Sequence, residues 1–135
     1  MGKIESVHTN AAPQPLPQFS QAVKYNGMVY CSGNIGLDPA TKQIVEGTVK
    51  DRARQALKNL QSVLEEAGSG LRNVVKVNVF ITTMDDFATM NEAYDEFFTS
   101  DPKPCRTCVA VKQLPFNTDV EIECTAALSI PSSRL

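Results

Sequence analysis

The chain has 135 residues, of which 42% are hydrophobic and 21% are charged. This length favours one domain, because single cores usually serve roughly 100 to 200 residues, and the composition excludes wholesale disorder. The formal net charge of -2 disfavours a dedicated nucleic-acid binder. Apolar stretches fall far short of the roughly 18 residues that span a bilayer, and no secretory signal is recognisable. We therefore expect a cytoplasmic protein, with mitochondria as the alternative.

Cysteine and histidine content narrows the possible chemistry. The 4 cysteines are interpreted as free thiols of a reducing compartment. Cys105 and Cys108 have the spacing of a redox dithiol or of half a zinc site. On a strand, however, three residues would separate the Cα atoms of Cys105 and Cys108 by about 10 Å and direct their side chains to opposite faces. We therefore expect neither a redox dithiol nor a zinc site there. With His8 as the single histidine, the sequence predicts no metal or other cofactor and no His-based nucleophile.

Composition also suggests the domain boundaries. Residues 1–17 hold three prolines between Pro13 and Pro17 and no apolar period, which predicts a flexible, extended leader. We expect a single folded domain over residues 18–130 and a short tail at 131–135.

Turn signals predict three strands before the first helix. Asn26-Gly27 is the strongest short-range hairpin signal, and it separates two β-prone runs. Asp38-Pro39 opens a turn that leads into a third, shorter run. The expected strands cover residues 19–25, 28–32 and 43–46.

Apolar residues at spacings of three and four predict two amphipathic helices. The first runs from Val49 to Ala67, with a capping box at Thr48 and Asp51 and a left-handed residue at Gly68. The second has Asp85 near its start as a cap or favourable charge. We expect its apolar stripe to belong to the core; its members are Phe87, Met90, Tyr94, Phe97 and Phe98.

Three further strands complete the prediction. Residues 74–81 alternate, and the buried side is expected to carry Val75, Val77, Val79 and Ile81. Residues 106–112 and 119–130 are expected to form a hairpin closed by residues 114–118. The order β-β-β-α-β-α-β-β predicts an α+β fold, a mixed β-sheet with two helices packed on one face.

The last strand predicts that the other face of the sheet has no helix cover. Its apolar residues should face the helices, which leaves Glu121, Glu123 and Thr125 on the opposite face. A mixed polar and apolar face of this kind is typical of a surface that subunits bury in a symmetric oligomer. We therefore expect a homo-oligomer.

The segment Pro104 to Val109, together with Leu114-Pro115 and Val120 to Glu123, resembles the signature of the RidA family of reactive intermediate deaminases, small trimeric imine and enamine hydrolases. The resemblance runs in order from about Ala12 to Leu128. It implies a fold like that of the trimeric chorismate mutases, with three sheets closing into a barrel and three clefts between adjacent subunits. The further matching residues are Phe19-Ser20-Gln21-Ala22, Ser32-Gly33, Ile35 to Pro39, Val74-Val75-Lys76, Asp86-Phe87, Asn91 and Tyr94.

The resemblance implies catalytic roles for two residues. Arg106 would hold the substrate carboxylate, since a guanidinium fork pairs with a carboxylate through two charge-assisted hydrogen bonds. Glu121 would position the attacking water and move its protons. From the residues alone, Arg106 could equally be a solvated cation at a strand end, and Glu121 a surface residue. Glu123 is interpreted as structural.

Five more residues would line the substrate pocket. The resemblance assigns Ser32, Gly33, Asn91 and Cys108 to it, although Ser32-Gly33 could simply form a turn and Asn91 could cap a loop. Phe19 stands where the family commonly has a Tyr whose hydroxyl reaches the ligand. Phe19 keeps the aromatic ring of that Tyr but cannot form its hydrogen bond to the ligand.

The expected terminal hairpin would put Arg106 and Glu121 on one face of the sheet, roughly 13 Å apart. One chain would struggle to join them at a small ligand. We therefore expect a neighbouring subunit to complete the site.

The function implied by the resemblance is hydrolysis of 2-imino acids and enamines, such as 2-aminoacrylate and 2-iminopropanoate, to 2-oxo acids and ammonia without a cofactor. The expected partners are a small imino acid and two further copies of the chain in a homotrimer, with no membrane. One alternative is a ligand-binding or holdase protein that uses the same cleft without turnover. Another is a ribonuclease or translation inhibitor, which the acidic composition disfavours.

Overall fold

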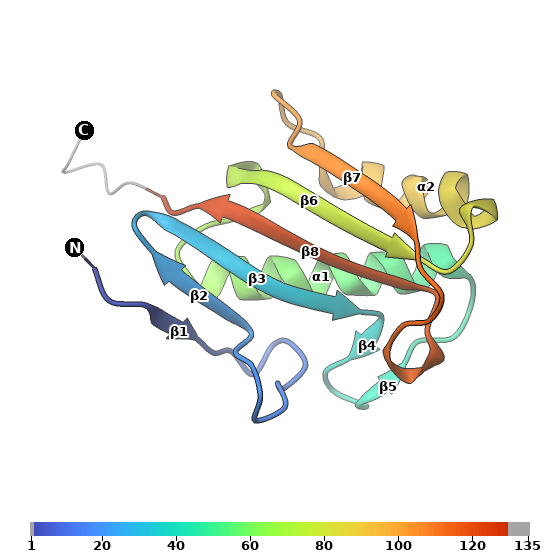
Figure 1. Cartoon of the computed structure of the whole chain (residues 1–135), viewed down its shortest axis with the longest axis horizontal. Coiled ribbons are helices and arrows are strands. Elements are labelled where there is room, and N and C mark those ends of the chain that lie inside the picture. The colour runs from blue at the N-terminus through green and yellow to red at the C-terminus, as the bar shows by residue number, and fades with distance from the viewer. Residues whose placement is uncertain (1, 130–135) are drawn as a thin grey trace.

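The computed structural model describes residues 2–129, so the expected tail at 131–135 lies outside the described residues. Six strands form one mixed sheet in the order β1-β2-β3-β8-β6-β7, and β4 pairs with β5 separately. Both helices lie on the same face of the large sheet (Figure 1), as predicted. Within residues 2–129, no helix is both long and apolar enough to cross a bilayer. The elements are β1 (Glu5–Val7), β2 (Ala22–Tyr25), β3 (Met28–Ile35), β4 (Leu37–Asp38), β5 (Gln43–Ile44), α1 (Val49–Glu66), β6 (Val74–Ile81), α2 (Phe87–Phe97), β7 (Cys105–Ala110) and β8 (Val120–Ala127).

The predicted β2–β3 hairpin and α1 are both confirmed. Asn26 and Gly27 both have positive φ, 50° and 79°, as the turn of a two-residue hairpin requires. At the start of α1, the Thr48 side chain accepts a hydrogen bond from the backbone N–H of Lys50, and Asp51 accepts one from the N–H of Thr48. Gly68, with φ of 86°, follows the end of the helix.

The N-terminal stretch differs from the flexible leader that its prolines predict. β1 pairs with β2 in antiparallel register, and Val7 and Ala12 are buried in the core. The buried Gln21 side chain accepts from the N–H of Thr9 at 2.7 Å and donates to the carbonyls of Thr9 and Pro13 at 3.0 and 2.9 Å. One side chain therefore satisfies backbone groups that a proline-rich segment cannot pair internally.

The predicted terminal hairpin is wrong. β7 pairs in parallel with β6, and β8 lies between β3 and β6, antiparallel to both. The connection β6–α2–β7 is thus a crossover between neighbouring parallel strands, with its helix on the covered face (Figure 1). As a result, β8 forms hydrogen bonds on both sides at the centre of the sheet, and β7 is an edge strand.

Two local predictions also fail. A register shift between Val74 and Lys76 breaks the alternation of β6, so that Val74 is buried and Val75 is 45% exposed. Of the two roles expected of Asp85, the cap is wrong, while its charge does lie just before the N-terminus of α2: its N–H donates to the Thr83 hydroxyl in a short 3-10 turn, Met84–Asp86, that precedes the helix. Asp86 is the residue at the N-cap of α2.

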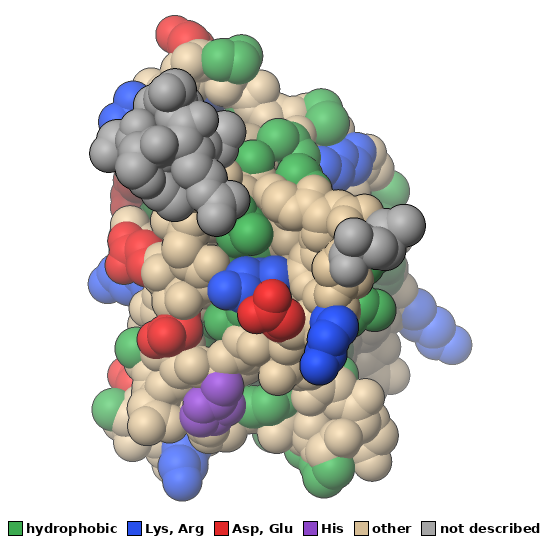
Figure 2. Space-filling view, turned by 90° about the vertical axis from the view of Figure 1, so that its left-hand side faces the viewer, with side chains coloured by type: hydrophobic (Ala, Val, Ile, Leu, Met, Phe, Trp, Pro, Cys, Tyr) green, Lys and Arg blue, Asp and Glu red, His purple; other side chains and the backbone are tan. Residues whose placement is uncertain are grey.

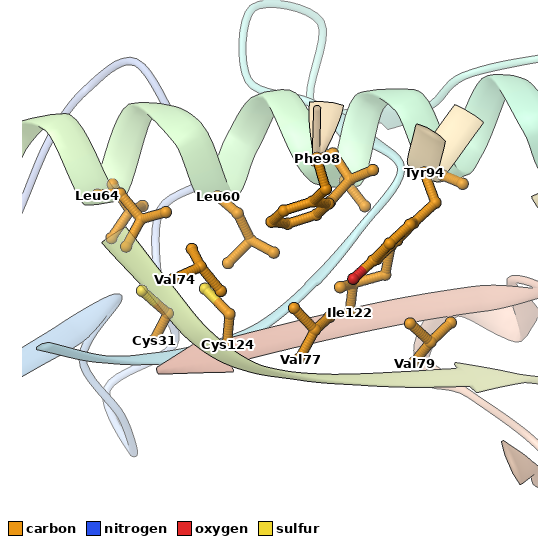
Figure 3. Packing of buried hydrophobic residues seen from close by; sticks show 14 of the residues in the cluster. Cys31, Leu60, Leu64, Val74, Val77, Val79, Tyr94, Phe98, Ile122 and Cys124 are labelled. Carbon is orange, nitrogen blue, oxygen red and sulfur yellow. The ribbon is translucent and has the colours of Figure 1, made fainter. Parts of the chain in front are cut away.

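The core fills the space between the helices and the sheet (Figure 3). Tyr94 and Phe98 extend from α2 toward β6 and β8, and their ring centroids lie 4.5 Å apart. Along β8 every second residue from Val120 is buried, as predicted. The opposite sheet face has no helix over it, and on it Tyr30 and Val109 are 45% and 41% exposed.

Candidate active site

An ion pair anchors the chain just before β8, two residues ahead of Glu121. Arg52 of α1 donates through Nε and Nη2 to the two carboxylate oxygens of Asp119, at 2.7 and 2.8 Å. The same guanidinium donates to the carbonyls of Val45 and Gly47. A bidentate pair of this kind gives geometric precision, and it fixes the first residues of β8 against α1.

Four of the predicted site residues line one cleft of about 310 Å³, which we call the Glu121 cleft. They are Phe19, Ser32, Gly33 and Glu121, and the prediction that they lie together agrees with the geometry. Apolar side chains make up much of the rest of the wall. The remaining lining residues are Pro13, Gln14, Pro15, Leu16, Gln21, Asn34, Ile35, Leu37, Pro115 and Phe116.

Ser32 and Gly33 lie at an irregularity of β3, where its register against β8 shifts between Cys31 and Asn34. The Ser32 hydroxyl donates to the carbonyl of Ser20 at 2.7 Å, which ties β3 to the segment that carries Phe19. A Cβ atom at Gly33 would lie 2.6 Å from Oε2 of Glu121. The glycine therefore leaves the space that the carboxylate occupies.

The two glutamates of β8 differ in their surroundings. Glu123 accepts a hydrogen bond from the Asn78 amide at 3.0 Å, in agreement with a structural role. Glu121 has no hydrogen-bond partner for its carboxylate among residues 2–129. Burial, and secondarily the nearby Glu123 charge, raises the pKa of the Glu121 carboxyl above its ordinary value of 4.5. A carboxyl with a raised pKa accepts a proton more readily than an ordinary glutamate does, which suits a group that takes up and returns protons.

Arg106 lies on β7 and points toward α2. Its Nη1 donates to Oδ1 of Asn91 at 2.7 Å, and its Cζ lies 4.6 Å from the centre of the Tyr94 ring and 5.5 Å from that of Phe87. No carboxylate of the described residues forms an ion pair with it. We call Arg106 and its three contacts, Phe87, Asn91 and Tyr94, the Arg106 cluster. Asn91 thus contacts the arginine directly and does not serve as a loop cap.

Cys108 lies two residues beyond Arg106 on β7, and the two are the partly buried residues of an otherwise exposed strand. Burial raises the pKa of its thiol. Cys105 is exposed, in agreement with the expectation that the two thiols face opposite ways, and all four cysteines are free. Cys108 therefore lies beside the Arg106 cluster as a neutral thiol.

Within one chain, the Glu121 cleft and the Arg106 cluster lie on opposite faces of the sheet, which contradicts the expected shared face. Arg106 is in register with Val77, which is buried under the helices. Glu121 is in register with Phe80, three positions further along β6 and therefore on the other face. The expected face rested on the β7–β8 hairpin, and β6 lies between these strands.

The sequence did not indicate Leu16 and Phe116 as walls of the cleft, nor the contacts of Phe87 and Tyr94 with Arg106. A signal was present for the second pair, since Phe87, Asn91 and Tyr94 follow i, i+4, i+7 spacing on one helix face. A larger cavity of about 660 Å³ lies between the C-terminal ends of α1 and α2. It contains none of the predicted site residues.

This architecture, with two helices on one face of a six-stranded mixed sheet, is found in solved structures. The crystal structure of yeast Mmf1 superposes with a TM-score of 0.90 at 39% identity and covers 94% of this chain and 100% of its own. That of RidA from an Antarctic Psychrobacter superposes with a TM-score of 0.87 at 40% identity and covers 92% and 99%. The chain therefore has the same α+β fold as these two structures.

Residues 9–128 match the family model described as Endoribonuclease L-PSP. The 2-iminobutanoate/2-iminopropanoate deaminase of Dermatophagoides farinae is 44% identical over 117 residues, 87% of this chain and 91% of the relative. Protein mmf1, mitochondrial, of Schizosaccharomyces pombe is 53% identical over 111 residues, 80% of this chain and 67% of the relative. The chain belongs to the RidA family.

Proposed function

We propose that the chain hydrolyses 2-imino acids and their enamine tautomers to 2-oxo acids and ammonia, in a site shared by two subunits. The proposal rests on two charged groups of one chain that have no oppositely charged partner among the described residues. One is a partly buried carboxylate with an apolar cleft beside it, and the other is a guanidinium without an acidic partner among the described residues. The similarity to one relative named 2-iminobutanoate/2-iminopropanoate deaminase and to another named Reactive Intermediate Deaminase A supports the same reaction.

Arg106 would bind the substrate carboxylate. Of its five N–H donors, one bonds Asn91, and the others have no acceptor among residues 2–129. A 2-imino acid has its carboxylate directly bonded to the imine carbon, so a bidentate pair would fix the carbon that is attacked.

Glu121 would act on water. Its carboxylate accepts one proton from a water molecule as the water oxygen bonds to the imine carbon and the C=N electron pair moves to nitrogen, and it passes that proton to the nitrogen to give a carbinolamine. Glu121 then takes the proton of the new hydroxyl and delivers it to the nitrogen, so that the C=O bond forms as the C–N bond breaks. The products are the 2-oxo acid and ammonia, and one water is consumed. The raised pKa of Glu121 supports both proton transfers.

A neighbouring chain would bring the two groups together. They occupy opposite faces within one chain, so a single small substrate can reach both only if the Arg106 cluster of one subunit faces the Glu121 cleft of another. The uncovered sheet face, with Tyr30 and Val109 exposed on it, supports a closed homotrimer that buries three such faces.

Two alternatives predict different outcomes. A ligand-binding or holdase protein would bind a 2-oxo acid without turnover. A ribonuclease, the activity in the family description, would need a basic face to bind phosphates. At the end of the molecule seen in Figure 2, Lys and Arg side chains are spread among acidic and neutral ones, and the net charge is -2. Charge therefore favours the imine hydrolase.

The location in the cell remains a prediction. One relative is named mitochondrial and one from Arabidopsis thaliana is named chloroplastic. We propose the cytoplasm for this chain, with mitochondria as the alternative.

The test is ammonia release from 2-iminopropanoate generated in situ from alanine by an amino acid oxidase. We expect acceleration by the wild-type protein, none by Arg106→Ala, and little by Arg106→Lys, because an ammonium cannot reproduce the planar fork. Arg54→Ala is the matched control, since Arg54 pairs with Glu96 on the helix surface. A wild-type rate equal to that of the buffer would refute the proposal.

A further inference from the structure

The aromatic stripe of α2 does more than fill the core. The sequence predicts core packing for Phe87 and Tyr94, and Tyr94 is indeed 8% exposed. Yet both rings also lie under the guanidinium of Arg106, at 5.5 and 4.6 Å from its Cζ atom. A cation within about 6 Å of an aromatic ring centre is attracted to the negative face of the ring.

Two kinds of contact therefore hold the guanidinium, and both come from α2. The Asn91 amide oxygen accepts one of its hydrogen bonds at 2.7 Å, while the two rings support the group from α2. An aromatic face holds a cation without occupying its N–H donors, whereas a carboxylate in the same place would occupy them. This arrangement orients a long side chain and leaves its hydrogen-bonding capacity to a ligand.

Tyr94 acts here through its ring. Desolvation by burial raises the pKa of its hydroxyl, so the group stays neutral and offers Arg106 no phenolate charge. In Figure 3 the ring extends from α2 toward the sheet, beside Phe98. Phe98 packs against Tyr94 with ring centroids 4.5 Å apart, and it is not one of the residues that contact Arg106.

We propose that Tyr94, assisted by Phe87, is a positioning residue that holds the Arg106 guanidinium in the orientation that binds a carboxylate substrate. This inference rests on the proposed function, because it assigns a purpose to an arginine that binds the ligand. It also explains why an arginine can stay partly buried without an acidic partner among the described residues: the rings and Asn91 compensate part of its desolvation.

The test compares Tyr94→Leu, Tyr94→Phe and Phe98→Leu in steady-state hydrolysis of 2-iminopropanoate. Tyr94→Leu removes the ring, and we expect KM to rise about tenfold, equivalent to about 1.4 kcal/mol of lost binding, with a much smaller change in kcat. Tyr94→Phe keeps the ring and should retain a KM within about twofold of the wild type.

Phe98→Leu is the matched control, since it makes the same kind of change in the same aromatic pair without a contact to Arg106. It should lower the melting temperature while leaving KM unchanged. If it raised KM as much as Tyr94→Leu, core packing would explain the effect and the inference would be overturned. Should Tyr94→Leu fail to fold, Phe87→Leu, at a partly buried position, should raise KM about threefold, and an unchanged KM would again overturn the inference.

The same experiment separates this inference from the proposed function. Loss of turnover in Arg106→Ala with an unchanged KM in Tyr94→Leu would overturn the role of Tyr94 alone. Wild-type turnover in Arg106→Ala would overturn the proposed carboxylate clamp, and with it the role of Tyr94.

Discussion

Gly33 lies directly against the carboxylate of Glu121, so closely that a Cβ atom would stand 2.6 Å from Oε2 and 2.8 Å from Cδ. These atoms are the end of a flexible side chain, and the backbone can stay in place if the carboxylate moves. We predict that Gly33→Ala folds normally and lowers kcat at least tenfold, because the displaced carboxylate no longer reaches the water.

Gly70→Ala is the control for that change. A Cβ atom at Gly70 would meet nothing within 4 Å, and its φ of 172° is extended backbone. Imine hydrolysis and thermal melting of both variants check the prediction. Full activity in Gly33→Ala would mean that the position of Glu121 does not matter for the reaction.

The raised pKa of Glu121 predicts the sign of a pH effect on stability. Above the ordinary value of 4.5, the unfolded chain releases this proton first. The folded state then holds more protons, and stability falls as pH rises. Glu121→Gln should therefore raise the melting temperature at about pH 7 and change it little at about pH 4. A gain of equal size at both pH values would contradict the assignment.

Gln21 predicts the behaviour of the N-terminal segment. Gln21→Leu removes three hydrogen bonds to Thr9 and Pro13, at a cost of about 1–3 kcal/mol, and should speed hydrogen exchange at the Thr9 amide. Activity should also fall, because Pro13 is part of the wall of the Glu121 cleft. Gln113→Leu is the control, since Gln113 is exposed and, among residues 2–129, its amide bonds only Asn117. Unchanged exchange at Thr9 would show that other contacts hold the segment.

Thr125 tests the assembly. It lies on the uncovered sheet face, opposite Tyr30 of β3 and Lys76 of β6. Light scattering should give about three times the monomer mass for the wild type, and Thr125→Glu should lower both that mass and the hydrolysis rate, because it buries extra negative charge between subunits. Thr99→Glu makes the same substitution at an exposed position just after α2, and it should change neither. A dissociated Thr125→Glu chain with full activity would refute a shared site.

Local signals predicted much of the fold. Asn26-Gly27 and the capping box of α1 act within a few residues, so their structures follow from the sequence at those positions. The positions of β7 and β8 depend instead on strands that are distant in the sequence. The short loop between β7 and β8 is compatible with a hairpin, so the sequence favoured pairing these two strands. In the structure β7 pairs in parallel with β6, because the crossover through α2 places it there.

Site residues were predicted in part for a similar reason. Phe19, Ser32, Gly33 and Glu121 do line one cleft, and Asn91 does contact Arg106. The relation between the two groups could not follow from strand alternation, because alternation gives the face of a residue only once its neighbouring strand is known. The buried Gln21 was also invisible as an anchor, since its partners are backbone groups of the N-terminal segment.

The central claim is that Arg106 of one chain and Glu121 of another act on the same imino acid. Its most direct test mixes Arg106→Ala and Glu121→Gln chains, unfolds and refolds them together, and measures ammonia release from 2-iminopropanoate. Each variant alone should be inactive. In trimers formed at random from equal amounts of the two variants, about a quarter of the shared sites combine an intact arginine with an intact glutamate. About a quarter of the wild-type activity should therefore return. A mixture with no more activity than either variant alone would contradict the shared site.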